Sequence, residues 1–552
     1  MKELWSKRIQ CLVVLCLLVT FYAMTRPLNH SESYDSINYV LFAENFPLGA
    51  APDSRNILFH AFNRILVVAS DSLGLNIGSL ELLSSISILT GALSLMLFAG
   101  LMKKRFDVST FSAWAGAGFL GLTYGYWRYT GAVEVYIPSM FLILASLSLI
   151  FSYLEDENRR QRTLVAGSVL AGLAVLFYQP NILVLFGAAF ILFCSSSHFL
   201  SFVRYSIIGA LVVLTGIALS FIAIHGSFPS SINELVGFIT DRNGEFRGRQ
   251  SLGISVIKAV LAFGHVILSA HWTRVIDPVR NFLDPLVPGC VYNFNVVVFG
   301  GKGIQHFVTL AAVLFIPVLV LFARINWIAS SKWKLAPPKR TTLFLLGWLA
   351  LLSLIVGVMD PGGFEAWIPA LLPFAGLLTV LVIEPCYQLG KKKSLLVFLA
   401  LLLCYNFFGG ALIWRNNQGD DFYHKTAWIR NELEESDTVL LNQYDYRIVD
   451  YLNYYSKARI VHLSGDDMVS IDRADPKIKY ISLDEFISQC EAEKTRLYTL
   501  GDVLSPTPDI KQCRLGDEKF NAAMKLADRL KENAVLVDES DSGDTFQIIF
   551  GQ

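Results

Sequence analysis

The sequence predicts a polytopic α-helical membrane protein with about eleven transmembrane helices, followed by a small extracytoplasmic α/β domain. Hydrophobic residues make up 53% of the 552 residues and only 17% are charged, whereas a soluble protein has about a quarter charged residues. Apolar runs of about 17–25 residues recur through the first three quarters of the chain, and each is long enough to cross a bilayer as a helix. We therefore expect a transmembrane domain at 1–415 and an α/β domain at 416–552.

The apolar runs predict where each helix lies. The first, at 8–25, follows a basic start and is interpreted as a retained helix, because no small-residue cleavage site of a secretory signal is clear. The later runs lie at 80–102, 109–127, 133–153, 163–178, 180–197, 205–225, 306–324, 341–358, 366–385 and 394–413.

The charges of the connections predict the orientation. With the N-terminus inside, every inner connection carries Lys or Arg: 103–105, 157–162, 195–204, 324–340 and 390–393. The outer connections YQP and DPGGFE carry neither. Because cytoplasmic loops are enriched in basic residues, this distribution places the connections 26–79 and 226–305 and the tail on the outer face. We expect an integral membrane protein of the bacterial inner membrane, with its functional face outside the cytoplasm.

The outer connection 226–305 is too long for a simple loop. It contains GISVIKAVLAFGHVILSAHW at 253–272, an apolar stretch that carries Lys258 and His265. This pattern favours an amphipathic helix that lies on the outer leaflet. A pair of short membrane spans is the alternative.

The tail changes character. Short apolar runs at the following ranges predict strands, with helices at 446–456 and 517–533 between them: 437–442, 458–464, 477–483, 495–499 and 534–538. Strands that alternate with helices predict an α/β domain, and no Gly-rich phosphate loop follows any of them. An extracytoplasmic location would allow a disulfide between Cys490 and Cys513.

Composition argues against two classes of site. Lys plus Arg and Asp plus Glu both number 46, so no nucleic-acid binding is expected. The eight cysteines include no CxxC pair, which leaves a zinc or thioredoxin-like site without support.

The first outer connection holds carboxylates just outside the first span. The stretch YDSINYVLFAEN supplies Tyr34, Asp35 and Glu44, and its apolar residues recur at helical spacing. Asp35 fits a helix N-cap, which is one explanation for it. The other explanation is a general base at the membrane surface. Asp35 and Glu44 are therefore candidate catalytic residues, and Tyr34 is a candidate substrate contact.

A second group of polar residues lies in WRYTGAVEVYIPSMF at 127–141. Glu134 stands in an otherwise apolar stretch, six residues after Arg128. Ionisable groups at membrane depth are costly and tend to be functional. Glu134 is thus a candidate catalytic residue, and Arg128 and Tyr136 are candidate substrate contacts. A structural pair of Glu134 with Arg128 is the alternative.

Three further outer regions supply candidate substrate-binding residues. YQPN at 178–181 offers Gln179, although a plain turn at Pro180 also explains this stretch. MDPGGFEAWIPALLP at 359–373 offers Glu365, with Trp367 as an aromatic residue of the membrane interface. The long outer connection adds residues suited to contacts with a phosphate: Arg242, Arg247, His271, Arg274 and Arg280.

These features together resemble the GT-C fold of integral-membrane glycosyltransferases, which include oligosaccharyltransferases, protein O-mannosyltransferases and aminoarabinose transferases. YWRYTGAVEVYIP is similar to the FW…EVY signature of the protein O-mannosyltransferase-related, DUF2723-like group. YDSINYVLFAEN and NILFH resemble the first-loop pattern of that group, and LAGLAVLFYQPNILVLF and PGGFEAWIPALLP resemble its downstream elements. The resemblance covers 20–200 and, more loosely, 340–385, but not the tail.

The resemblance implies an inverting transferase that moves a hexosyl or pentosyl group at the outer face. The donor would be a polyprenyl- or dolichyl-phosphate sugar in the lipid membrane, and the acceptor a protein, a lipid or a glycan. Asp35 would be the general base, Glu134 would position Asp35 or the acceptor, and Arg residues would hold the phosphate.

The first loop departs from the family pattern. It has no Asp-Glu or DxD pair, and GAAPDSRN at 49–56 replaces the HPPG-like element. No metal site or other cofactor is therefore assigned, although a divalent cation is compatible with the chemistry.

Three other functions compete with this one. A transporter or flippase would show ionisable residues within spans and inverted repeats, whereas the charges here cluster at the outer ends. A polysaccharide polymerase or ligase shares much of the chemistry, but its usual large outer loop falls late in the chain. A scaffold whose tail binds a partner is the third alternative.

Overall fold

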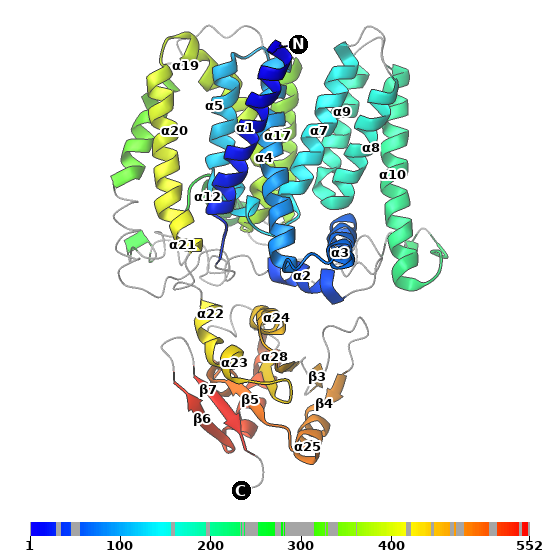
Figure 1. Cartoon of the computed structure of the whole chain (residues 1–552), viewed down its shortest axis with the longest axis vertical. Coiled ribbons are helices and arrows are strands. Elements are labelled where there is room, and N and C mark those ends of the chain that lie inside the picture. The colour runs from blue at the N-terminus through cyan, green and yellow to red at the C-terminus, as the bar shows by residue number, and fades with distance from the viewer. Residues whose placement is uncertain are drawn as a thin grey trace. The chain divides into compact units, whose positions relative to one another are not determined.

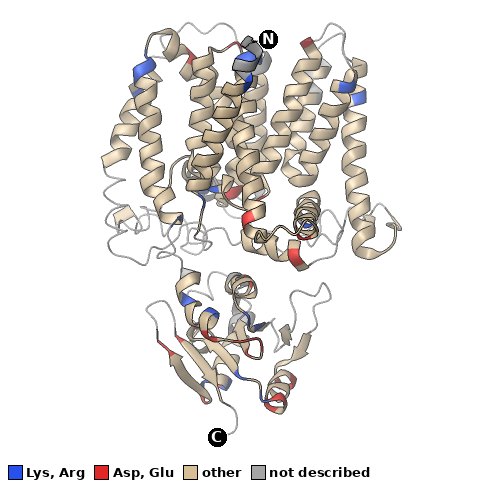
Figure 2. Ribbon diagram, in the orientation of Figure 1, with Lys and Arg blue, Asp and Glu red and all other residues tan. Residues whose placement is uncertain are grey.

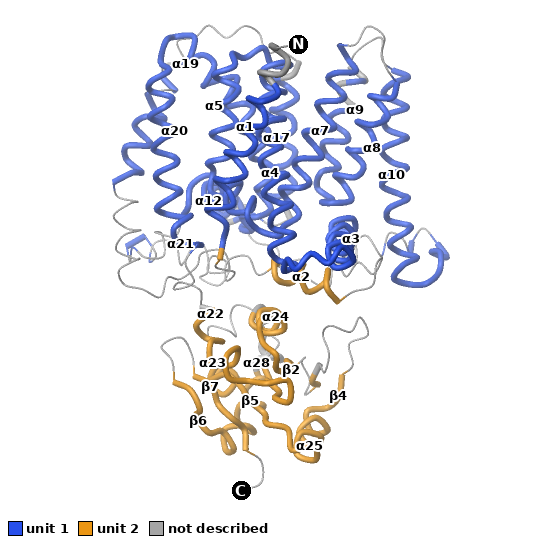
Figure 3. The backbone as a smooth tube through the Cα atoms, viewed as in Figure 1, with its two compact units in different colours: residues 1–27, 48–282, 303–415 blue, residues 28–47, 283–302, 416–552 orange. Residues whose placement is uncertain are grey.

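The computed structural model shows a helical part and an α/β part (Figure 1). It describes residues 2–28, 35–45, 56–155, 161–194, 199–231, 233–234, 237, 252–270, 276, 278–279, 281, 314–325, 327–328, 340–359, 361–415, 421–442, 446–463, 468–470, 480–506, 516–539 and 544–549. The chain forms two compact units (Figure 3). Unit 1 comprises residues 1–27, 48–282 and 303–415, and unit 2 comprises residues 28–47, 283–302 and 416–552.

Unit 1 is built from helices. Its first half contains α1 (Lys2–Met24), α3 (Ile57–Ser72), α4 (Ser79–Arg105), α5 (Thr110–Leu122), α6 (Tyr124–Thr130), α7 (Tyr136–Glu155), α8 (Gln161–Phe177), η1 (Gln179–Asn181), α9 (Ile182–Cys194) and α10 (Phe199–His225). Its second half contains α12 (Leu252–Ile267), a helix at Leu314–Ile325, α17 (Arg340–Met359), η2 (Phe364–Ala370), α18 (Leu371–Leu378), η3 (Thr379–Ile383), α19 (Glu384–Gln388), α20 (Lys392–Asn406), η4 (Phe407–Ala411) and α21 (Leu412–Trp414).

Every predicted apolar run coincides with helical segments among the described residues. Five of the helices described are long and apolar enough to cross a membrane by length and composition: Ser79–Arg105, Tyr136–Glu155, Phe199–His225, Phe364–Gln388 and Lys392–Trp414. Apolar side chains on these helices, such as Leu211 and Leu396, are exposed on the unit, as expected for surfaces that face lipid. The number of spans stays a prediction.

Some predicted helices are broken. The run 109–127 divides at Thr123, whose extended backbone (ψ 144°) separates α5 from α6. The helix predicted from 133 begins only at Tyr136. Pro138 explains this start, because it has no N–H to donate to the carbonyl of residue 134 and is tolerated only in a first turn. Glu134 therefore lies in the connection before α7 rather than within a span, which corrects the sequence prediction.

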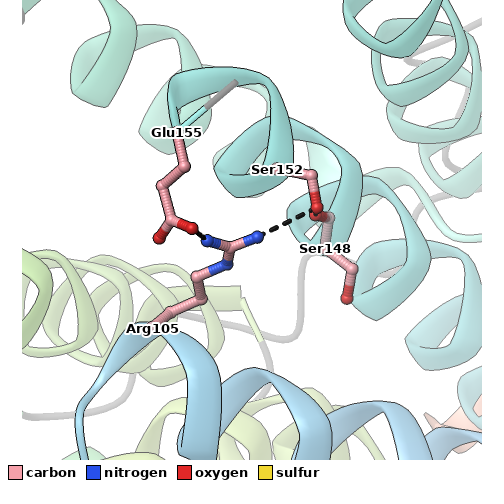
Figure 4. Close-up of polar contacts among 4 residues, drawn as sticks. All are labelled: Arg105, Ser148, Ser152 and Glu155. Carbon is pink, nitrogen blue, oxygen red and sulfur yellow. Dashed lines mark hydrogen bonds and ion pairs between the residues drawn. The ribbon is translucent and has the colours of Figure 1, made fainter. Parts of the chain in front are cut away.

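Charged residues are concentrated toward the ends of the helices of unit 1 (Figure 2). At one end, an ion pair between Arg105 and Glu155 joins the last turns of α4 and α7, and the Arg105 Nη2 donates to Ser152 Oγ at 3.0 Å (Figure 4). The hydroxyls of Tyr153 and Ser201 are hydrogen-bonded at 2.6 Å. These contacts bring together elements that flank three predicted inner connections, 103–105, 157–162 and 195–204.

The remaining contacts of this end come from later in the chain. The Ser109 N–H donates to Glu384 Oε2 at 2.9 Å, and the Lys392 Nζ lies 4.9 Å from the centroid of the Phe111 ring. Lys392 belongs to the predicted inner connection 390–393. We call this the basic end of unit 1, defined by residues 103–112, 152–155, 201 and 384–393. The Lys and Arg residues of this end belong to connections that the sequence analysis placed on the inner side.

Unit 2 contains a seven-stranded mixed sheet in the order β4-β3-β2-β1-β5-β7-β6. The strands are β1 (Thr438–Asn442), β2 (Arg459–Leu463), β3 (Met468–Ser470), β4 (Tyr480–Ser482), β5 (Leu497–Leu500), β6 (Ala534–Asp538) and β7 (Thr545–Ile548). Strand β1 is parallel to β2 and β5, and the other pairs are antiparallel.

Helices cover both faces of this sheet. They are α22 (Asp421–Lys425), α23 (Ala427–Glu432), α24 (Tyr446–Tyr455), α25 (Leu483–Glu493), α26 (Gly501–Leu504) and α28 (Gly516–Lys531), and a further helix, α2 (Asp35–Asn45), packs against α24. Along β1 the side chains alternate: Val439 and Leu441 pack with the helices α23 and α24, and Leu440 packs with α25 and α28. The sheet thus lies between two apolar cores.

The five predicted strands and both predicted helices of the tail are confirmed. The predictions missed the strands β3 and β7 and the helices α22, α23, α25 and α26. Strand β3 has only three residues, too few for an alternating pattern. Helix α25 did have a signal, since the Ser482 side chain accepts from the Glu485 N–H as an N-cap. Cys490 is a free, buried thiol of α25, so the disulfide is not formed, and Cys513 lies outside the described residues.

Candidate functional site

The end of unit 1 opposite the basic end is rich in aromatic residues. Thr25, just after α1, is the meeting point of two tryptophans: Trp127 Nε1 donates to Thr25 Oγ1 at 2.8 Å, and Trp414 Nε1 donates to the Thr25 carbonyl at 2.9 Å. These bonds join the first, second and last quarters of the unit. We call this the aromatic end, defined by Thr25 and residues 124–136, 178–181, 364–367 and 405–414.

Two buried charged side chains lie at the aromatic end. Arg128 of α6 and Glu134 of the connection before α7 are each only 1% exposed. The Arg128 guanidinium lies 5.8 Å from the centroid of the Trp414 ring, within the range of a cation–π contact. Between the two charges, Gly131 ends α6, and a Cβ there would lie 2.5 Å from Pro27 Cδ. Close packing on the segment after α1 therefore requires glycine at 131.

A single tyrosine gathers several of the predicted residues. Tyr129 Oη donates to Glu365 Oε1 at 2.6 Å, and the Glu134 carboxyl lies within electrostatic range of the Tyr129 hydroxyl. The Tyr136 ring lies edge-on to Tyr129 at 5.6 Å and to Tyr178 at 5.2 Å between centroids. We call these five residues the Tyr129 cluster.

The cluster has a definite chemistry. Two carboxyl groups from segments far apart in the sequence lie around one phenol; Tyr129 and Glu134 are buried, and Glu365 is half-buried. Electrostatic interactions are stronger in such surroundings than in water. Carboxylates held in this way can accept hydrogen bonds from hydroxyl groups of a sugar or an acceptor, and the rings offer apolar faces beside them.

Helix α12 contributes a second polar surface. It is one helix, packed against η2, α6 and α17, and its buried side carries Lys258 and His265. Its exposed side carries Val256 and Val260, so the location of this helix on the outer leaflet stays a prediction. The polar side faces the protein because the rings of Tyr124 and Phe364 enclose His265, at 4.7 and 4.8 Å between centroids.

The same end is braced by Asn406. Its Nδ2 donates to the carbonyls of Leu122 and Ile267 at 2.7 and 2.9 Å, and its Oδ1 accepts from the Ser269 N–H at 3.0 Å. Just after it, η4 is a turn of π-helix, a form that recurs at functional sites. Asn406 thus fixes the ends of α5, α12 and α20 against one another and holds the aromatic end rigid.

Other predicted residues have structural roles. Asn181 donates from Nδ2 to the Ala174 carbonyl at 2.9 Å, which closes the turn after α8 that Pro180 was expected to make. Gln179 is half-buried next to Tyr178 of the cluster. Trp367 was expected at the lipid interface, but it is buried, and its Nε1 donates to the Pro361 carbonyl at 3.3 Å. The prediction for Trp367 was wrong because η2 folds this segment into the core.

The remaining candidates are divided between the units. Asp35 and Glu44 are the half-buried acids of α2, which belongs to unit 2. Tyr34 and the five residues of the long outer connection lie outside the described residues: Arg242, Arg247, His271, Arg274 and Arg280. Within the part of the chain that is described, no group of three or more His, Cys, Asp or Glu side chains is placed to hold a metal ion.

Sequence reasoning missed two residues of the aromatic end. Tyr129 stands between Arg128 and Glu134 in the quoted stretch, and its place next to a buried arginine was the available signal. Trp414, which touches both Thr25 and Arg128, had no local signal because its partners lie far away in the sequence.

The many apolar helices of unit 1 agree with the resemblance to the GT-C fold, and the α/β unit agrees with the pattern of the tail, which the resemblance does not cover. No protein-family model matches the sequence, and neither does any curated protein. Solved structures do match. ArnT from Cupriavidus metallidurans, bound to undecaprenyl phosphate, aligns over 99% of this chain and 98% of its own, with a TM-score of 0.50 at 13% identity.

A second match is the Archaeoglobus fulgidus oligosaccharyltransferase, tethered to an acceptor peptide that contains the NVT sequon. It aligns over 99% of this chain and 75% of its own, with a TM-score of 0.49 at 13% identity. The likeness to ArnT shows the fold: this chain has the GT-C fold that the sequence predicted.

Proposed function

We propose that this protein is a membrane glycosyltransferase that moves a sugar from a polyprenyl-phosphate-linked donor to an acceptor on the outer face of the membrane. The observation that carries the proposal is the buried Glu134 with the Tyr129 cluster, at the end of unit 1 opposite the basic end. The fold supports it, because the similar ArnT structure is bound to undecaprenyl phosphate.

The location follows the same pattern. The inner connections are basic, so the positive-inside rule favours the cytoplasm for the basic end and the outer side of a bacterial inner membrane for the aromatic end. About eleven transmembrane helices would then cross the membrane between the basic end and the aromatic end. Unit 2 would be extracytoplasmic together with the candidate site.

The reaction follows from the chemistry of such a donor. A hydroxyl or amine of the acceptor attacks the anomeric carbon of the sugar, a new bond forms there, and the bond to the phosphate oxygen breaks. The configuration at that carbon is inverted. A carboxylate takes the proton of the acceptor, and the lipid phosphate leaves with the bonding electrons, its charge stabilised by basic side chains.

Particular residues are proposed for these roles. Asp35 is the general base, and Glu44 lies on the same helix. Glu134 and Glu365 orient the acceptor or the base through the Tyr129 cluster, together with Tyr136 and Gln179. Arg128 is a buried positive charge near them, and the basic residues of 242–280 are the proposed phosphate contacts.

The test is sugar transfer from a panel of polyprenyl-phosphate sugars by the purified full-length protein. We expect turnover by the wild type and a loss of at least about 100-fold in Asp35→Asn, since general bases contribute about 10²–10⁴-fold. Asp71→Asn makes the same change on the exposed side of α3 and should be active. Full activity of folded Asp35→Asn would reject Asp35 as the base.

Absence of turnover by the wild type with every donor and acceptor class would reject the transferase. A flux assay in liposomes would then test transport of the lipid-linked sugar.

A further inference from the structure

Helix α24 of unit 2 is buried on two opposite sides. On one side Ile448, Val449 and Leu452 pack in the core that contains Val439 and Ile460 of the sheet. Successive residues of a helix are about 100° apart, so Asp450 points away from that core. Asp450 is nevertheless only 2% exposed. Something other than the sheet must cover this side of α24.

Among the described helices outside the sheet cores, α2 is the one that packs against α24. It packs against α24, although α2 ends at residue 45 and α24 begins at residue 446. Its buried residues recur at helical spacing: Ile37 is 1% exposed, Val40 is fully buried, and Ala43 is 2% exposed. The first outer connection of the chain thus supplies a helix to the α/β unit.

This packing is needed for α2 to be ordered. The helix has 11 residues, and isolated helices shorter than about 12–15 residues are marginal in water. The tertiary contact with α24 therefore fixes its position. Its two ends carry Asp35, in the first turn, and Glu44, in the last, and both side chains are half-buried.

We propose that the α/β unit is a positioning module of the transferase: α24 holds α2, and α2 sets the place of Asp35. The proposal rests on the proposed function, in which Asp35 is the base. On this view the tail is a working part of the enzyme, and Val40 is a positioning residue for a carboxylate more than one helical turn away. Misplacement of a reacting group by 1 Å can cost about 10²-fold in rate.

The experiment uses the full-length protein in detergent or nanodiscs. Val40→Asp places a carboxylate at a fully buried position, where burial without a partner strongly disfavours its charged form. Asn45→Asp adds the same charge at an exposed position of the same helix and is the matched control. Val40→Ala is a milder second variant, which keeps the test valid if Val40→Asp does not fold.

Two readouts are needed. Hydrogen exchange should show faster exchange, by at least about tenfold, of amides in both α2 and α24, while β1 and β5 stay protected. In transfer assays kcat should fall at least about 30-fold in Val40→Asp and about threefold in Val40→Ala, with the KM for the donor within about threefold of wild type. Asn45→Asp should match the wild type in both readouts.

Unchanged exchange in α24 together with unchanged kcat in Val40→Asp would overturn the proposal. Faster exchange in both helices with a normal kcat would overturn its functional part. If the wild type transfers no sugar, the proposed function fails on that result, while the exchange data still decide whether α24 holds α2.

Discussion

The two ends of unit 1 use charge in opposite ways. At the basic end the Glu155 carboxylate that pairs with Arg105 is 63% exposed, whereas Glu134 at the aromatic end is 1% exposed. An exposed ion pair contributes about 0–1 kcal/mol, and a buried charge costs several kcal/mol even after relaxation. The exposed Glu155 carboxylate thus costs little free energy, while the buried Glu134 costs more, and the proposed function would account for that cost.

One buried tyrosine at each end shows the same difference between the two ends. Tyr129 at the aromatic end and Tyr153 at the basic end are both buried, and each makes a hydrogen bond of 2.6 Å. Tyr129 donates to a carboxylate, and Tyr153 bonds to the hydroxyl of Ser201. The two hydrogen bonds have the same length, so the difference between them lies in the partner, which is a carboxylate for Tyr129 and a hydroxyl for Tyr153.

The largest expected effect is at Glu134. Glu134→Gln keeps the shape of the side chain and removes the charge, so we expect a loss of at least about 100-fold in kcat. Glu155→Gln makes the same change at the basic end and should stay within about twofold of wild type. Initial rates of sugar transfer measure both variants. Equal activities of the two would erase the distinction between the ends.

An intermediate effect is expected for Tyr129→Phe. It removes a hydrogen bond to a charged group, worth about 1.5–3 kcal/mol, and frees Glu365 to move, so transfer should fall about tenfold. Tyr153→Phe is the matched variant: it should lower the melting temperature without lowering transfer. Thermal melts and transfer rates of both variants are compared. A loss of activity in Tyr153→Phe as large as in Tyr129→Phe would show that these bonds act only through stability.

The smallest effect is expected for Arg105→Gln. The variant removes the ion pair with the exposed Glu155 carboxylate and the bond to Ser152 from an Arg105 side chain that is 9% exposed, at a cost of about 1–2 kcal/mol. Transfer should be unchanged, and the small loss of stability should shrink further at high salt, since salt screens exposed charges. Denaturation at two ionic strengths measures this. A loss of transfer at either salt concentration would assign the basic end a part in the reaction.

The order and type of the elements could be predicted from the sequence. Apolar runs gave the helices of unit 1, alternating short runs gave five strands of unit 2, and Lys and Arg gave the connections of the basic end. These signals are local, because hydropathy and charge act on each segment wherever its neighbours lie. Predictions failed where one residue overrides the pattern, as Pro138 does by delaying the start of α7.

What surrounds each candidate residue was decided by the tertiary structure. Tyr129 is hydrogen-bonded to Glu365, which lies 236 positions later in the sequence. Helix α12 buries its polar side in the protein. Helix α2 packs against α24, which lies about 400 residues later in the chain. The sequence by itself determined the helices, the strands and the side of each connection. Only folding decided which buried charges meet, because such pairs depend on packing between distant segments, which no local period records.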